Sequence, residues 1–206
     1  MKIRTILFIC FCVLATASAA TNSPVELFVD SSKPESEIDL TRYALGQGGL
    51  SYKPMFDAHV EQIRQLHPKT IRVFVQEFFD LYPERGRYSW GKLDKFIENI
   101  LATGAKPILA LCFKPKVLYP KIDQHIVHPN DYKEWEELIF QLVKHCNAEK
   151  NYGIEYWEIS NEPDIGEDGG CPYLFQKEDY VIYYQHTAAA IQRADPKAKI
   201  GGPALA

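Results

Sequence analysis

Two hydrophobic patterns alternate along this chain, short continuous apolar runs and a helical spacing of three and four, and they predict alternating strands and helices. Short, nearly continuous apolar runs favour strands at 43–46, 70–75, 107–113, 154–159 and 198–203. Between them, apolar side chains spaced three and four apart predict helices at 56–66, 89–103, 131–146 and 177–194. Ser89 is a candidate N-cap, and Asp131 with Glu134 matches a capping box.

This order predicts parallel strands joined by right-handed crossovers, in either a doubly wound sheet or a β/α barrel. A doubly wound nucleotide fold needs a glycine fingerprint after its first strand, and 47–49 does not supply one. Polar residues instead end two strands, with Gln76 and Glu77 after the second and Asn161 and Glu162 after the fourth. Because barrel active sites lie at that rim, we predict a (β/α)8 TIM barrel, of which this chain supplies about the first four to five βα units.

Residues 1–20 have the pattern of a secretory signal peptide. Lys2 and Arg4 precede an apolar run at 6–14, and the small residues at 17–19 suit a cleavage site. An N-terminal membrane anchor is the alternative, but the run is too short for a permanent transmembrane helix. We therefore expect a secreted or periplasmic protein with no membrane association after cleavage.

The remainder has the composition of a soluble globular protein, with 46% hydrophobic and 24% charged residues in the 206-residue sequence. We interpret 21–41 as an N-terminal extension and 42–206 as the barrel domain. Loss of the two basic residues of the leader changes the net charge from −4 to −6, which argues against a nucleic-acid partner. Cys112, Cys146 and Cys171 remain and allow at most one disulfide. No Cys or His spacing matches a zinc site, and we expect neither metal nor cofactor.

Glu162 is the candidate with the clearest chemistry. It follows a stiff, aromatic-rich strand, and Pro163 prevents that strand from continuing. A half-sheltered carboxyl at a strand end has a raised pKa, which suits a general acid near neutral pH. The alternative is an ordinary Glu-Pro loop with a solvated carboxylate, because a short motif is only a hypothesis until its context fits.

Several spaced motifs together resemble glycoside hydrolase family 39, the family of β-xylosidases and α-iduronidases. They occupy 87–94, 104–107, 152–153, 161–164 and 200–204. The resemblance extends from about Gly46 to Ala206 and implies a retaining, metal-independent glycosidase built on a TIM barrel.

The resemblance also implies roles for individual residues. Glu162 corresponds to the general acid/base and Asn161 to the residue that binds the sugar 2-hydroxyl. Arg72 resembles the arginine that supports the nucleophile, although a buried structural cation is an equal alternative. Gln76 and Glu77 are candidates for substrate contact, with a salt bridge at the rim as the alternative.

Two departures leave the sugar unspecified: Ser160 stands where the family often has Trp, and the tip of the second strand lacks a His-Gly pair. The family's nucleophile lies on the seventh strand, and neither Glu77, Glu158 nor Asp164 matches that position. We therefore expect the N-terminal half of a longer barrel, from a retaining glycoside hydrolase that cleaves O-glycosidic bonds of plant or host polysaccharides or oligosaccharides. The alternative is a non-catalytic carbohydrate-binding remnant or pseudoenzyme. The oligomeric state stays open.

Overall fold

Five parallel strands form one sheet whose order follows the chain, β1-β2-β3-β4-β5. The strands are β1 (Leu45–Gln47), β2 (Thr70–Val75), β3 (Lys106–Leu111), β4 (Tyr156–Ile159) and β5 (Lys199–Gly201). The helices between them are α1 (Val60–Gln65), α2 (Gly91–Ala102), α3 (Tyr132–Lys144) and α4 (Lys177–Ala194). The predicted alternation is confirmed.

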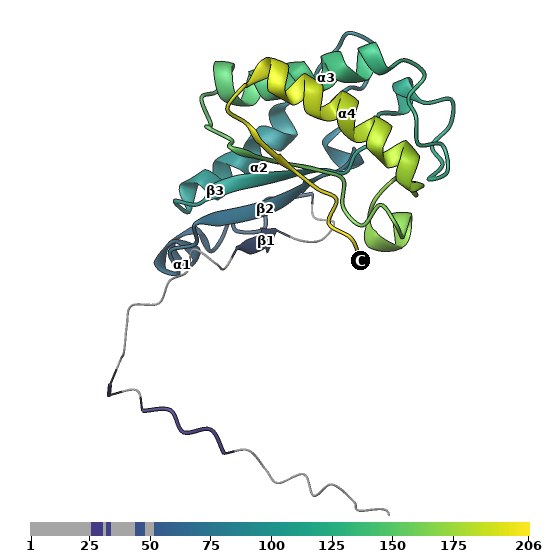
Figure 1. Ribbon diagram of the computed structural model, residues 1–206. Helices are drawn as coiled ribbons and strands as arrows, with labels where there is room; N and C mark the ends of the chain where they lie inside the picture. The colour runs from purple at the N-terminus through teal and green to yellow at the C-terminus, as the bar shows by residue number, and fades with distance from the viewer. Residues whose placement is uncertain (1–25, 31, 34–43, 48–51) are drawn as a thin grey trace, which may run out of the picture. The chain divides into compact units, whose positions relative to one another are not determined.

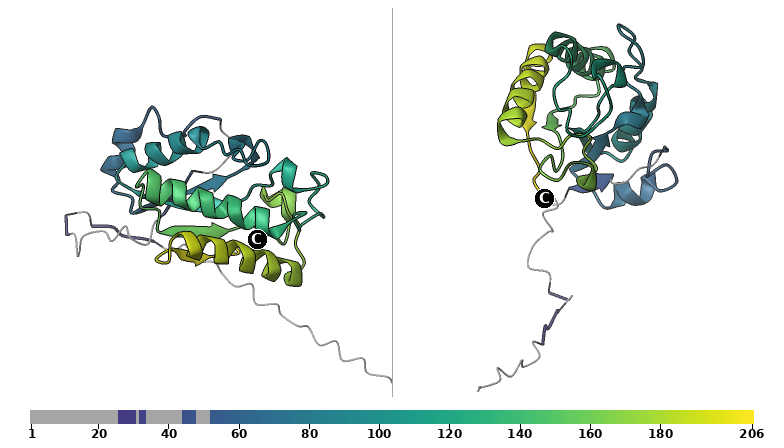
Figure 2. Two further views of the ribbon diagram at one scale, coloured as in Figure 1. Left: turned by 90° about the horizontal axis from the view of Figure 1, so that it is seen from above. Right: turned by 90° about the vertical axis from the view of Figure 1, so that its right-hand side faces the viewer.

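The order of the strands decides between the two predicted architectures. Each crossover moves to the next strand in the same direction, so right-handed connections put successive helices on the same face. In Figure 1, α2, α3 and α4 lie on one side of the strands. The right-hand view of Figure 2 shows the helices following one another around an arc, with the strands on its inner side. These are consecutive βα units of a TIM barrel, as predicted.

The computed structural model describes residues 26–30, 32–33, 44–47 and 52–206. The chain divides into two units, Met1–Ile38 and Asp39–Ala206, and all described helices and strands belong to the second. The expected signal peptide and most of the expected extension lie outside the described residues. Within the described ranges, no helix is both long and apolar enough to cross a membrane.

Burial alternates along β2 and β4, so the two faces of the sheet differ. In β2, Ile71, Val73 and Val75 are buried in the core, whereas Arg72 and Phe74 are partly exposed. The helices cover the first set, and the second set lies on the opposite face, which is the interior side of a barrel. The strand therefore carries its polar chemistry on the interior side.

The N-terminus of α3 confirms one predicted cap and corrects its second half. The side chain of Asp131 accepts a hydrogen bond from the Lys133 backbone N–H at 2.8 Å, as an N-cap does. Glu134 does not complete a capping box. Its carboxylate instead accepts a hydrogen bond from the Tyr82 hydroxyl at 3.0 Å and forms an ion pair with Arg85. Both of these residues belong to the β2–α2 connection.

The predicted Ser89 cap of α2 is wrong. The helix begins at Gly91, and the preceding Trp90 makes no side-chain cap. The Ser89 backbone N–H donates to the Leu81 carbonyl at 3.0 Å, and Trp90 stacks on His145 with ring centroids 5.3 Å apart. Packing of the aromatic ring onto His145, just after α3, therefore overrides the local capping preference.

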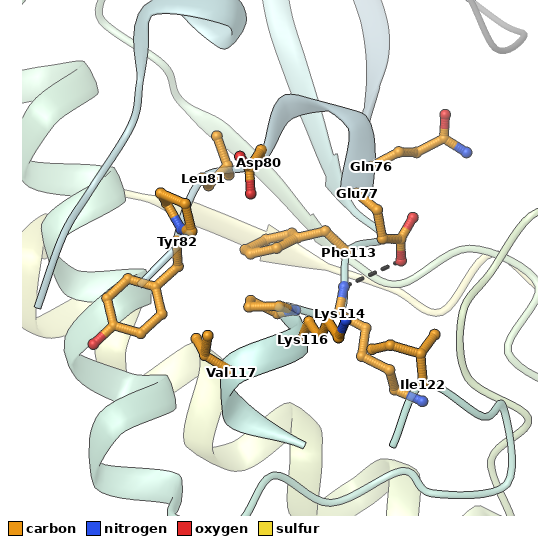
Figure 3. A pocket seen from close by; sticks show the side chains of 12 residues that line it. Gln76, Glu77, Asp80, Leu81, Tyr82, Phe113, Lys114, Lys116, Val117 and Ile122 are labelled. Atoms are coloured by element: carbon orange, nitrogen blue, oxygen red, sulfur yellow. Dashed lines mark hydrogen bonds between the residues drawn. The ribbon is translucent and has the colours of Figure 1, made fainter. Parts of the chain in front are cut away.

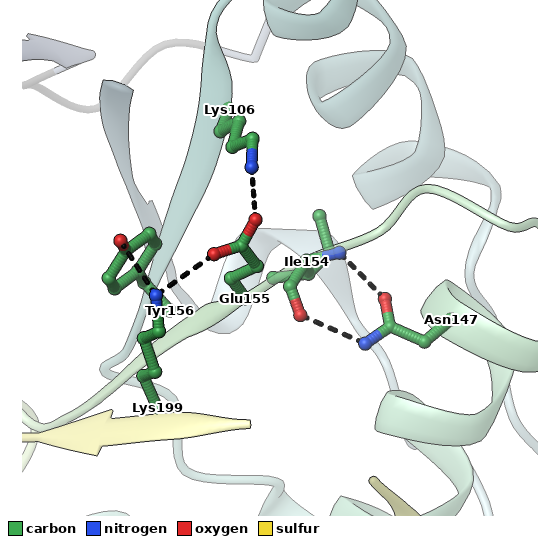
Figure 4. Close-up of polar contacts among 6 residues, drawn as sticks. All are labelled: Lys106, Asn147, Ile154, Glu155, Tyr156 and Lys199. Carbon is green, nitrogen blue, oxygen red and sulfur yellow. Dashed lines mark hydrogen bonds and ion pairs between the residues drawn. The ribbon is translucent and has the colours of Figure 1, made fainter. Parts of the chain in front are cut away.

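Polar contacts at the N-terminal ends of the strands hold β3, β4 and β5 together (Figure 4). Glu155 pairs with Lys106 and with Lys199, the latter at 3.1 Å. The Asn147 amide brackets Ile154, accepting from its N–H at 2.8 Å and donating to its carbonyl at 2.9 Å. This end of a barrel serves stability, which leaves the opposite end for chemistry.

Candidate active site

The tip of β4 carries two residues in the left-handed backbone region. Ser160 has φ of 70° and Glu162 has φ of 42°, values uncommon outside glycine. The Ser160 N–H donates to the Leu111 carbonyl of β3 at 3.2 Å, and the Glu162 N–H donates to the Ala204 carbonyl at 2.6 Å. Neighbouring segments thus hold a costly conformation in place, as is typical of functional sites.

The Glu162 side chain is half-buried and packs over Gly169. A Cβ placed on Gly169 would lie 2.6 Å from the Glu162 Cβ and would also clash with its carboxylate. Asn161 is only 5% exposed. Its Nδ2 donates to the Gly169 carbonyl at 2.9 Å, and its Oδ1 accepts from Arg72 Nη2 at 2.8 Å. The amide is therefore fixed in orientation beside the acid.

Arg72 joins β2 to the end of β4 through a bidentate ion pair with Glu158. Nε donates to Oε2 at 2.6 Å, and Nη2 donates to Oε1 at 2.7 Å. Ala110 of β3 is in register with Glu158, and its small side chain leaves room for the pair to span that strand. Burial lowers the pKa of Arg72, but the hydrogen bonds and charge of Glu158 outweigh it, so the net pKa is raised. The guanidinium stays charged and also lies 4.3 Å from the Phe74 ring centroid.

Gln76 and Glu77 follow β2 and line a cavity of about 410 Å³ between the β2–α2 and β3–α3 connections (Figure 3). The Lys114 backbone N–H donates to Glu77 Oε1 at 3.2 Å. The Glu77 side chain keeps accessible surface, yet the protein around its carboxyl removes water. Desolvation therefore raises the pKa of Glu77, against smaller opposing effects of backbone hydrogen bonds and of the Lys114 charge.

The predicted site residues thus form two groups that meet at a glycine pair. Arg72, Asn161 and Glu162 gather at the β4 tip, and neither Asn161 nor Glu162 is among the residues that line the cavity. A Cβ on Gly170 would lie 3.9 Å from the Gln76 amide nitrogen, while the adjacent Gly169 contacts both residues of the acid–amide pair. This loop is the link between the acid and the cavity.

Sequence reasoning missed the two residues that organise these groups. Glu158 was only one of several nearby acids. Side chains alternate between the two faces along each strand, and the register of β2, β3 and β4 puts Glu158 on the same face of the sheet as Arg72. Lys114 follows an apolar strand, and no local signal marks it as buried.

The three expected mature cysteines are all buried and unpaired. Cys171 lies closest to the acid, with its sulfur 3.0 Å from the Ser160 hydroxyl oxygen. Burial raises the pKa of this thiol, so it stays protonated at neutral pH. It packs as a small buried group beneath the β4 tip.

A family model described as "Glycosyl hydrolases family 39" matches residues 53–206. The chain belongs to family 39 of the glycosyl hydrolases. Two β-xylosidases are each 30% identical, over 133 residues in the protein from Geobacillus stearothermophilus and over 128 residues in that from Caldicellulosiruptor saccharolyticus. These matches cover 57% and 58% of this chain, but 25% and 26% of those proteins.

Solved structures of family 39 proteins share the fold. The enzyme from Xanthomonas axonopodis pv. citri aligns with a TM-score of 0.63 at 24% identity, over 79% of this chain and 35% of its own. A β-xylosidase from Caulobacter crescentus aligns with a TM-score of 0.61 at 25% identity, over 79% and 40%. The chain therefore spans about a quarter of the length of the curated relatives it matches.

Proposed function

We propose that the protein carrying this chain is a retaining glycoside hydrolase with Glu162 as its general acid/base. The observation that carries the proposal is the β4 tip: a half-buried carboxyl in a strained backbone, beside an amide held by Arg72. Membership of family 39 supports hydrolysis of glycosidic bonds as the reaction class. Because the chain matches only part of its relatives, the activity is proposed for the whole protein.

In the first step, a nucleophilic carboxylate bonds to the anomeric carbon while the Glu162 carboxyl gives its proton to the glycosidic oxygen, and the leaving group departs. In the second step, the resulting carboxylate takes a proton from the water that releases the sugar. Retaining enzymes need a second carboxylate, roughly 5 to 5.5 Å from the first, as nucleophile. We assign that role to a residue outside this chain, because the acid nearest to the inner face, Glu158, is neutralised by Arg72.

The amide of Asn161 is positioned to bind the sugar 2-hydroxyl. Its Nδ2 has two N–H groups, one of which goes to Gly169, so the second remains for substrate. A hydrogen bond to that hydroxyl strengthens as positive charge grows on the ring. The charged Arg72 holds the acceptor side of the amide and so fixes the orientation of its donor side.

We propose that Gln76 and Glu77 contact the part of the substrate that enters the cavity. The substrate class is a plant or host oligosaccharide or polysaccharide, and xylosides are the first to test because two relatives are β-xylosidases. The N-terminal pattern supports export from the cytoplasm. Mass spectrometry of the mature N-terminus would test this, since cleavage near residue 20 is expected and an intact Met1 would contradict it.

Aryl glycosides with leaving groups of different acidity test the acid role. We expect Glu162→Gln to abolish turnover of substrates with poor leaving groups and to affect good leaving groups least, because only the former need protonation. Unchanged rates on poor leaving groups would remove Glu162 from the mechanism. Sugar binding without turnover by the unmodified protein would indicate a carbohydrate-binding protein instead.

A further inference from the structure

Lys114 is the only lysine or arginine among the described residues that is buried, with 1% of its surface exposed. It lies three residues beyond the end of β3, on the same end of the sheet as the acid. Burying an ammonium is costly unless hydrogen bonds and partner charges replace water. Its surroundings therefore have to explain why a lysine occupies this position.

Among the described residues, no carboxylate forms an ion pair with the amine. Nζ donates to the Asp123 carbonyl at 2.6 Å and to the Pro172 carbonyl at 2.9 Å. It also lies 4.4 Å from the ring centroid of Tyr173 and 5.1 Å from that of Tyr119. The two phenol oxygens are 2.9 Å apart and hold the rings in place. The amine is thus flanked by two rings, and within the described part of the chain its hydrogen bonds go to main-chain carbonyls only.

These bonds join three separate connections. The backbone N–H of Lys114 holds Glu77 in the β2–α2 connection. Its amine holds Asp123 in the β3–α3 connection and Pro172 in the β4–α4 connection. The last of these includes Gly169, which contacts both Asn161 and Glu162. Lys114 is therefore a contact common to the three loops that surround the candidate site.

The path from the lysine to the acid is short. Next to Pro172, Cys171 donates its N–H to the Gly166 carbonyl at 3.0 Å and places its sulfur against Ser160. Anchoring the carbonyl of Pro172 therefore restrains 166–172, the segment on which the Glu162 side chain rests. A shift of about 1 Å at a reacting group is enough to reduce a rate about 100-fold.

We propose that Lys114 is a positioning residue that holds the 166–172 segment against Asn161 and Glu162. Its amine does not contact the acid, and it acts through main-chain carbonyls. Burial lowers the pKa of Lys114 to about 8, with the charge of Asp123 opposing this effect. A neutral amine still has two N–H donors for two carbonyls, so the clamp operates in both protonation states.

The test uses Lys114→Met, which keeps the length of the side chain and removes its donors, in the longest natural form of the protein. We expect kcat on aryl glycosides to fall about 10- to 100-fold while KM changes by less than about threefold, with the largest loss on poor leaving groups. Lys114→Arg, which keeps the donors, should restore most of kcat. Lys121→Met is the matched control, because that exposed amine contacts the side chain of the same Asp123 from the solvent side, and its kcat should not change.

A second readout does not depend on activity, because the kinetic arm rests on the proposed function. Loss of the clamp should speed hydrogen–deuterium exchange in 166–172 and make the buried Cys171 reactive toward a thiol reagent, with the labelled residue identified by mass spectrometry. A protein without glycosidase activity would refute the proposed function yet leave this arm intact. If Lys114→Met does not fold, Lys114→Leu, which also lacks side-chain donors, carries the same comparison. Wild-type exchange and thiol protection in a folded variant would overturn the proposal.

Discussion

Replacing Arg72 by Met tests whether the ion pair with Glu158 holds the β4 tip. The substitution leaves a carboxylate whose side chain is only 15% exposed without either of its two hydrogen bonds at 2.6 and 2.7 Å. It also removes the donor to Asn161. Loss of one partner of a buried pair costs about 3 to 5 kcal/mol. Since both side chains retain some exposure, we expect the lower end, about 3 kcal/mol of unfolding free energy.

Urea unfolding at pH 7 measures this loss as a lower midpoint at constant slope. Adding Glu158→Gln to Arg72→Met should recover about 1 to 2 kcal/mol, because the double variant no longer buries an unpaired charge. Arg85→Met is the matched control: it breaks another arginine–glutamate pair, but Arg85 is 58% exposed, so the loss should stay below about 1 kcal/mol. Equal losses of stability in the Arg72 and Arg85 variants, or no recovery in the double variant, would contradict this role of the ion pair.

Three further substitutions have defined outcomes. Gly169→Ala should lower kcat about tenfold or more by displacing Glu162, whereas Gly91→Ala, which has open space around its Cβ, should leave kcat unchanged; equal rates in both variants would contradict the packing argument. The pKa of Glu77 is higher in the folded state than in the unfolded state, so the folded state keeps the proton to a higher pH. The free energy of unfolding therefore falls as pH rises from the unfolded pKa through the folded pKa. Glu77→Gln should therefore gain stability relative to wild type between pH 4 and pH 7 in urea unfolding, and a constant difference would refute this. For Lys114, with its folded pKa lowered from 10.5 to about 8, the unfolded state binds the extra proton between these values. Wild type should therefore gain up to about 3 kcal/mol over Lys114→Met as pH rises from 7.5 to 10.5, and a flat difference would exclude the shift.

The strand–helix alternation was predictable because each strand is a dense apolar run and each helix has a regular stripe. Helix boundaries were less so. The start of α2 was misplaced because Trp90 packs on His145, a residue that follows α3 and is 55 positions away. A local capping rule contains no information about such a contact. The order of the strands, by contrast, followed from the choice of a barrel over a doubly wound sheet, which rested on the polar residues at the strand ends.

The candidate site divides in the same way. Glu162 and Asn161 could be located because the strand, the polar tip and the proline are adjacent in sequence. The partner of Arg72 could not be chosen from several acids, since the pair spans 86 positions. Lys114 was harder still, because its acceptors are main-chain carbonyls, and the carbonyl of Pro172 is 58 positions away. Main-chain acceptors leave no residue signature.

The bond from the Glu162 N–H to the Ala204 carbonyl links the orientation of the acid to a segment synthesised some forty positions later. A nascent chain that has emerged only as far as residue 162 already contains the acid, but it lacks the acceptor that helps to hold the acid's backbone. The backbone of Glu162 therefore reaches its final orientation late, once β5 and the residues after it have docked against β4. Substitutions near 202–204 should consequently impair catalysis without touching sugar.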